Sequence, residues 1–363
     1  MAFPSFSKVL TFVSILLIPA SLTGCSSLKY LFQAGKGQLA LLNHAKPIPE
    51  VIKDPRTPPR VKDLLSEVAP VKKFGEENGL KPTSSYQDYV KLDRMAAVWV
   101  VSACEPLKFK SKEWEFPIVG TFPFLGWFDL EDAQEFANEL KQEKWDVDFR
   151  GARAYSTLGW FRDSVLSTML SQDSGDSENN EALGDLVNVI LHESVHATLY
   201  IKGQSYFNES LASFVADRLT KTYIVKTRGE QSPLLSAYLK ELKRSAAIEK
   251  EMHQAYGELS KVYDSDEPDS EKLTKKKKRL TELQTKLHFR REINNATLIQ
   301  FKTYNTGEEY FSMFLKRCNG DWDDFLRLLG NLDSNSFSKT QEEDFGPVIE
   351  ERLHGLKCEP KLK

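Results

Sequence analysis

The chain has 363 residues, 40% of them hydrophobic, which is enough for one large domain or two modest ones. Its 49 lysines and arginines nearly balance its 52 aspartates and glutamates, and the formal net charge is −3. This balance, without a basic face interleaved with aromatic residues, excludes nucleic acid from the expected partners. No two of the four cysteines have the CxxC spacing of a metal site.

The first 24 residues are organised like a targeting segment. Lys8 supplies positive charge, and residues 9–22 form an apolar stretch too short to span a bilayer comfortably. The stretch leads into Leu22-Thr23-Gly24-Cys25, which resembles a lipobox. We expect cleavage before Cys25 and acylation of its thiol and amine, so that several acyl chains hold the protein on a membrane. An ordinary signal peptide or an anchor helix is the alternative.

The region that follows has mainly helical spacing. Leucines fall on one side of a helix over residues 28–45, and prolines then interrupt residues 46–60, which we predict to be extended or loop. Helical spacing returns at 60–77 and at 86–104. The predicted division of the chain is a targeting segment, an anchor with an N-terminal helix and linker, and one large domain: 1–24, 25–60 and 61–363.

Residues 105–161 have a different character. The segment 114–128 is aromatic and rich in glycine and proline, which predicts short strands. An amphipathic helix is expected over 130–144 and another strand over 145–155. The sequence therefore predicts a predominantly helical α+β fold with a small sheet.

The strongest chemical signal is His192-Glu193-Ser194-Val195-His196, an H-E-x-x-H. It lies in a run of helical periodicity over residues 183–200, so the two imidazoles lie one turn apart on one face. There they can share one divalent ion, and Glu193 can act as a base toward a metal-bound water. The five-residue motif alone also arises by chance, so its surroundings matter.

Those surroundings offer a third metal ligand, which a catalytic zinc site needs. Residues 202–205 break the helix, and residues 206–217 have the spacing of a second amphipathic helix with Asn208-Glu209 near its start. A helix, a tight turn and a returning helix bring Glu209 back over the histidine pair. The predicted site is a Zn²⁺ ion held by three side chains: His192, His196 and Glu209.

The remainder is charged and helical. Two long helices broken at residues 264–269 predict a hairpin over about 232–292. Its basic run 275–279 is either a solvated helix face or a contact for anionic lipid or cell-wall polymer. Residues 292–304 and 307–329 are further helices, and the tail from Leu332 is less regular. In an oxidising compartment Cys318 can pair with Cys358 and leave Cys104 buried, but the sequence leaves the pairing open.

Beyond the metal motif, the chain resembles a bacterial family of predicted zinc aminopeptidases that occur as lipoproteins. The resemblance extends over about residues 22–305 and rests on the lipobox, the H-E-x-x-H and four further segments: 30–39, 154–161, 207–210 and 294–296. It implies the His, His, Glu ligand set of gluzincins and a zincin-like core. It also implies zinc-dependent hydrolysis of peptides from the N-terminus, an aminopeptidase activity.

The resemblance also implies further roles. In zincins an edge strand pairs with the peptide substrate, and we assign that role to the strand near residues 154–156. Glu193 is the expected base, and Tyr304, with His288 as the alternative, is the expected donor to the oxyanion. Ser213 stands where many gluzincins have an aspartate that orients a ligand histidine. The candidates to replace that aspartate are Asp217, Asn188 and Asp185.

The expected location is the bacterial cell envelope. Ser26 after the cysteine favours the outer membrane, with the chain facing the periplasm. The expected partners are a peptide substrate and the membrane, reached through lipidated Cys25. Two alternatives remain: a zinc endopeptidase of the same type, and a catalytically silent lipid-anchored interaction protein in which zinc only joins two helices. Glu193 argues against the latter, because a structural site has no need of that carboxylate.

Overall fold

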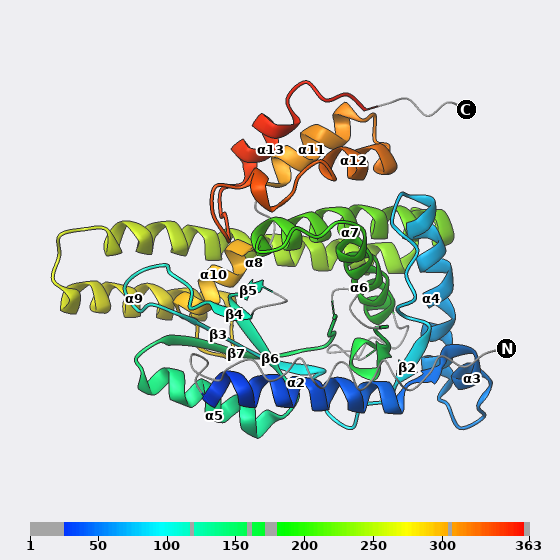
Figure 1. The fold of residues 1–363 in the computed structure, drawn as a ribbon, viewed down its shortest axis with the longest axis horizontal. Helices are drawn as coiled ribbons and strands as arrows, with labels where there is room; N and C mark the ends of the chain where they lie inside the picture. The colour runs from blue at the N-terminus through cyan, green and yellow to red at the C-terminus, as the bar shows by residue number, and fades with distance from the viewer. Residues whose placement is uncertain (1–24, 117–119, 158–161, 171–179, 304–306, 359–363) are drawn as a thin grey trace, which may run out of the picture.

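The computed structural model of the chain describes residues 25–116, 120–157, 162–170, 180–303 and 307–358. The fold is α+β and mostly helical, with small sheets, as predicted (Figure 1). Among the described helices, none combines the length and the apolar character needed to cross a bilayer. The helices are α2 (Cys25–His44), α3 (Ile48–Lys53), α4 (Pro59–Glu77), α5 (Leu130–Gln142), α6 (Asn180–Thr198), α7 (Ser205–Arg228), α8 (Pro233–Tyr263), α9 (Asp269–Leu287), α10 (Asn295–Thr303), α11 (Glu308–Arg317), α12 (Trp322–Leu329) and α13 (Gly346–Leu353).

The described strands form three small sheets. One is an antiparallel sheet in the order β6-β3-β7; in another, β2 pairs antiparallel with β1 and parallel with β8; the third is the β4-β5 hairpin. The strands are β1 (Lys46–Pro47), β2 (Asp88–Val90), β3 (Val98–Cys104), β4 (Trp114–Phe116), β5 (Gly120–Phe122), β6 (Phe124–Trp127), β7 (Asp146–Ala152) and β8 (Val165–Leu166).

The β6-β3-β7 sheet is covered on both faces. Helix α5 packs against β3 and β7, and α10 also contacts β3 and β7. Asp129 starts α5 by accepting hydrogen bonds from the backbone of Glu131 and Asp132. The pairing of β3 with β7 runs along the whole strand, from Val98 opposite Ala152 to Cys104 opposite Asp146. The sheet lies between these two helices, beside the helical part that contains α6 and α7 (Figure 1).

The helix predicted over residues 86–104 is wrong, because this region forms β2 and β3. β3 is the central strand of its sheet, and six of its seven residues are buried. A strand covered on both faces is apolar at nearly every position, so it has no alternation to distinguish it from a buried helix. Its valines and tryptophan, which favour strands, were the available signal.

Three other boundaries also differ from the prediction. Residues 46–60, expected as extended or loop, contain α3 and the start of α4, because Pro49 and Pro59 lie in first turns, where a missing N–H costs nothing. The strand expected over 145–155 ends at Ala152, so residues 154–156 lie outside it and the edge strand placed there is wrong. The tail expected to be less regular contains α13.

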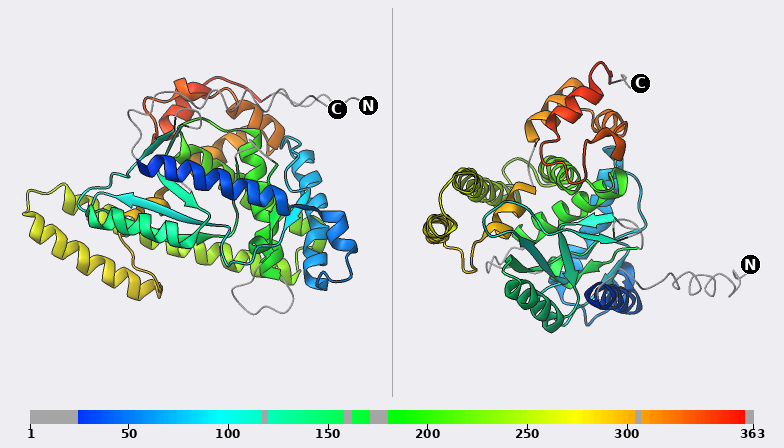
Figure 2. Two further views of the ribbon diagram at one scale, coloured as in Figure 1. Left: turned by 60° about the horizontal axis from the view of Figure 1, so that its bottom comes forward. Right: turned by 60° about the vertical axis from the view of Figure 1, so that its left-hand side comes forward.

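The two long charged helices are present as α8 and α9, which pack against each other. The first part of α8 packs against α6, and its later part projects with α9 from one end of the molecule (Figure 2). The basic run 275–279 on α9 is mostly neutralised within the protein. Lys276 is buried and donates to Asp146, and Lys275 and Arg279 pair with the acidic residues Glu267 and Glu258. This pairing agrees with neither a fully solvated face nor a free basic patch.

The largest cluster of buried side chains joins α4, α6 and α7 to the C-terminal helices. Helix α6 contributes Leu186, Val187, Ile190, Leu191 and Val195, none of which is exposed to solvent. This burial holds α6 against α4 and α7. The position and rotation of the helix that carries the H-E-x-x-H are therefore determined by the core.

The C-terminal region is linked by the disulfide between Cys318 and Cys358, and Cys104 is a buried free cysteine. The pairing that the sequence left open is thus confirmed. Cys318 ends α11 and Cys358 follows α13, so the bond closes a loop that contains α12 and α13.

Replacing both cysteines, Cys318→Ser with Cys358→Ser, is expected to lower the free energy of unfolding by about 4 kcal/mol, because the bond closes a loop of 40 residues. Urea denaturation followed by circular dichroism measures the change. Reducing the parent chain should give the same loss, and the double variant should not respond to the reductant. An unchanged midpoint in the double variant would contradict the prediction.

Candidate metal centre

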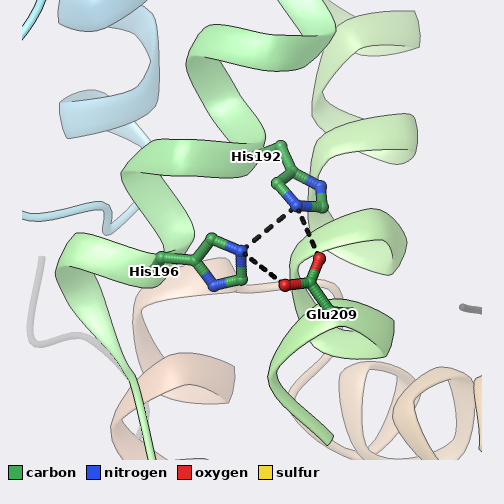
Figure 3. Close-up of side chains that lie close together, drawn as sticks. All are labelled: His192, His196 and Glu209. Carbon is green, nitrogen blue, oxygen red and sulfur yellow. Dashed lines mark hydrogen bonds and ion pairs between the residues drawn. The ribbon is translucent and has the colours of Figure 1, made fainter. Parts of the chain in front are cut away.

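The two histidines of the motif lie one turn apart on α6, as their spacing requires. Their ring centroids are 4.8 Å apart and the ring planes are nearly perpendicular, at 85°. The Nε2 atom of His196 lies 3.2 Å from the Nε2 atom of His192. Both rings therefore direct the same nitrogen into one small space (Figure 3).

Asn208 holds the turn that returns the chain to this space. Its side chain accepts a hydrogen bond from the backbone N–H of Ile201 at 2.9 Å and donates to the carbonyl of the same residue at 2.8 Å. Gly203 lies between them with φ +77°, a conformation that L side chains rarely adopt. The buried amide thus fixes the start of α7, and with it the next residue, Glu209.

Glu209 completes a three-residue cluster with the histidines. Its Oε2 atom lies 3.3 Å from His192 Nε2, and its Oε1 atom lies 3.6 Å from His196 Nε2. One ligand atom from each of the three residues lies within 4.8 Å of the others (Figure 3). Two imidazole nitrogens and a carboxylate are donors that divalent transition metals accept, so these three residues could hold a metal ion.

The electrostatics of the cluster favour an ionised carboxylate. Burial opposes the charge of Glu209, but His196 and His192 outweigh it and hold the pKa of Glu209 well below its usual range. Burial likewise opposes a charge on His196, while Glu209 and Glu193 raise its pKa overall. A carboxylate that stays charged at neutral pH is ready to bind a cation.

Glu193 lies beside this cluster, since its charge acts on His196. Its Oε2 atom is buried and has no hydrogen-bond partner in the described part of the chain. The Nδ1 atom of His196 is also buried and has no hydrogen-bond partner among the described residues. A buried carboxylate oxygen without a hydrogen-bond donor carries a desolvation cost in the folded chain.

The residues predicted to orient the ligands divide into two groups. Asn188 donates to the Oδ1 atom of Asp217 at 2.8 Å, and Tyr238 donates to the same atom at 3.2 Å. Burial raises the pKa of Asp217, while these hydrogen bonds and the charge of His192 act in the opposite direction. Asp217 and Asn188 thus form a network near His192. Asp185 instead pairs with Arg153 at 3.3 Å.

Two residues that the sequence analysis missed lie near Glu193. Tyr86 is buried, and the charges of Glu193 and Asp163 add to burial in raising its pKa. Its φ of 62° is unusual for a bulky residue, and its N–H donates to the carbonyl of Asp163 at 2.6 Å. The Asp163 carboxylate accepts hydrogen bonds from the Thr157 backbone and hydroxyl. These contacts hold residues 156–157 beside Asp163.

Tyr200 is a further residue that the sequence analysis passed over. Its ring centroid lies 6.2 Å from that of His196, and burial and the charge of Glu209 raise its pKa to about 12. The phenol therefore remains protonated at neutral pH and can donate a hydrogen bond beside the cluster. Its position four residues after His196 was the signal that could have identified it.

The structure describes only some of the other residues for which the sequence predicted a role. Tyr304 lies outside the described residues, as do the targeting segment and residues 158–161. His288 is exposed at the end of α9, where it adopts a left-handed conformation. Helix α2 begins at Cys25, whose side chain is not among those described. The roles of Tyr304 and Cys25 therefore stay predictions.

Comparison with known proteins assigns the chain to a family. No curated protein and no solved structure gives a match to the chain. A family whose description reads "Putative aminopeptidase" matches residues 29–343. The matched region is most of the 363 residues, and it includes the three clustered residues and Glu193. The chain therefore belongs to this aminopeptidase family.

Proposed function

We propose that the protein is a zinc-dependent aminopeptidase with a gluzincin ligand set and a zincin-like core. The observation that carries the proposal is the convergence of His192, His196 and Glu209 with Glu193 beside them. The family supports a peptidase, and the donor set supports the metal. A helical site next to a small sheet is the arrangement that a zincin-like core requires.

The spacing of the donors supports zinc. Nitrogen and oxygen ligands bind zinc at about 2.1 Å, and tetrahedral ligand atoms at that distance lie about 3.4 Å from one another. The three separations in the cluster are 3.2, 3.3 and 3.6 Å. The cluster thus has the size of three corners of a zinc tetrahedron, which leaves the fourth corner for a reactant.

The chain's own residues account for the proton transfers. A bound zinc ion would lower the pKa of a water molecule to about 7 and polarise the peptide carbonyl. Glu193 would accept the proton of the attacking water and pass it to the leaving amine. Tyr304 is the proposed donor to the oxyanion, and Tyr200 offers a second protonated phenol near the ligands.

The proposed location follows from the sequence. The apolar residues 9–22 and the lipobox that ends at Cys25 support a lipid anchor at the outer membrane. In this arrangement the catalytic domain faces the periplasm. Peptides that reach that compartment are the proposed substrates.

The proposal predicts zinc-dependent release of N-terminal residues. The purified chain should contain about one zinc per molecule by elemental analysis. Incubation with a peptide library and mass spectrometry should show loss of single residues from peptides with a free amine. N-acetylated copies of the same peptides are the control and should stay intact. A chelator should stop turnover, and added zinc should restore it.

Other outcomes would identify the alternatives. Cleavage of internal bonds in both peptide sets would indicate an endopeptidase with the same chemistry. One zinc per chain without any cleavage would support an anchored interaction protein in which the metal joins α6 and α7. Absence of zinc even after reconstitution would overturn the enzyme proposal.

A further inference from the structure

One side of helix α2 exposes large apolar side chains. The exposed fractions are 51% for Leu31, 75% for Phe32, 58% for Leu39 and 40% for Leu42. With 100° of rotation per residue, these four side chains fall within an arc of about 100°. We call them the α2 apolar face. Large apolar side chains that share one exposed side of a helix are a feature of contact surfaces.

The opposite side of α2 is fixed to the rest of the protein. Gln33 donates to the carbonyl of Gly126 at 3.2 Å and accepts a hydrogen bond from the backbone of Phe128 at 2.9 Å. Gly37 packs so closely on the Phe128 ring that an added Cβ would lie 2.2 Å from it. The helix is thus docked on β6 and the chain that follows it, so the α2 apolar face has a fixed direction relative to the domain.

The position of the helix indicates what covers this face. α2 begins at Cys25, directly after the apolar residues 9–22, and it lies along the outside of the molecule (Figures 1 and 2). It contains Lys29 and Lys36 but no acidic residue. A helix with an outward apolar face, lysines and no acidic residue is typical of helices that lie in the membrane interface.

We propose that the α2 apolar face lies in the interface of a lipid bilayer and orients the catalytic domain on the membrane. This contact is additional to acylation of Cys25 and does not depend on the metal. Lys29 is already paired with Asp132 and Glu135, so apolar contact rather than charge supplies most of the attraction. One lipid-bearing residue would leave the domain free to rotate, whereas a docked helix restricts it to one orientation.

The test uses the chain from residue 25 onward with Cys25→Ser, which keeps every described element and cannot be acylated. Binding is measured by co-sedimentation with vesicles of phosphatidylcholine and with vesicles of equal parts phosphatidylcholine and phosphatidylglycerol. The parent should bind both. Replacing the whole α2 apolar face by glutamine, which has a similar helix propensity, should reduce partitioning about tenfold or more.

A matched control carries four glutamine substitutions at exposed apolar positions on other elements, and it should bind like the parent. These positions are Leu239, Leu273 and Met313 on helices, and Leu356 in the chain after α13. Circular dichroism verifies that both variants are folded. If the α2 variant is unfolded, a polarity-sensitive dye on Phe32→Cys decides instead: its emission should shift to the blue with vesicles, and the same dye on Leu273→Cys should not respond.

Several results would overturn the proposal. These are a parent that does not bind vesicles, equal losses in the α2 variant and in its control, and no dye response at position 32. A parent that ignores vesicles but forms dimers through the α2 apolar face would assign the face to a second copy of the chain. Each result is separate from peptidase activity, which is measured without vesicles.

Discussion

Glu193→Gln is expected to lower kcat for peptide hydrolysis by about a thousandfold or more, because the amide cannot accept the proton of the attacking water. The zinc content should stay near one per chain, since Glu193 is not among the three clustered donors. The substitution is nearly isosteric, so the fold should survive. Turnover of the best library peptide and elemental analysis of the same samples measure both quantities.

The matched control is Glu271→Gln, which alters an exposed glutamate on α9. This variant should keep the parent's kcat and zinc content. If Glu193→Gln retains turnover, Glu193 is not the base. If it loses zinc together with turnover, the carboxylate contributes to metal binding and the proposed division of roles fails.

His196→Ala is expected to remove the metal and with it all activity. His196 supplies one of three donors, and its side chain is only 3% exposed, so nothing from solvent restores the geometry. Loss of a ligand should weaken metal affinity by more than the roughly 10–100-fold that loss of an outer hydrogen-bond partner costs. Metal content after dialysis and titration with zinc measure the effect.

The thermal stability of the protein with and without zinc tests the role of His196 independently. Metal that binds only the folded state stabilises it by about 4 kcal/mol at a concentration a thousand times its Kd. Zinc should therefore raise the Tm of the parent and of the control His354→Ala, whose histidine is exposed, but not that of His196→Ala. Equal zinc responses in all three proteins would contradict the predicted ligand set.

Much of the helical fold could be predicted from the sequence. Helices α5, α8 and α9 have exposed sides, and apolar residues that recur every three to four positions mark them in the sequence. Strand β3 was misread because it is covered on both faces and carries no such pattern. The helix α3 was missed because its proline stands in the first turn, where it is compatible with a helix.

The environment of Glu193 was the part of the site that could not be predicted. Tyr86 and Asp163 are far from Glu193 in the sequence, and neither belongs to a motif with known spacing. In the folded chain Tyr86 donates its N–H to the carbonyl of Asp163. The charge of Glu193 raises the pKa of both residues. Such contacts depend on how β2, β8 and α6 pack, which no local pattern encodes.

By itself, the sequence determined the placement of the two histidines and of the neighbouring Glu193, because positions i and i+4 of a helix meet whatever the rest of the fold does. It also marked Asn208-Glu209, although not what the asparagine does. Only the tertiary structure decided that Glu209 lies 3.3 Å from His192, since that distance depends on the turn held by Asn208 and on the packing of α6 against α7. Contacts within one helix are local and follow from spacing, whereas contacts between helices require the whole core.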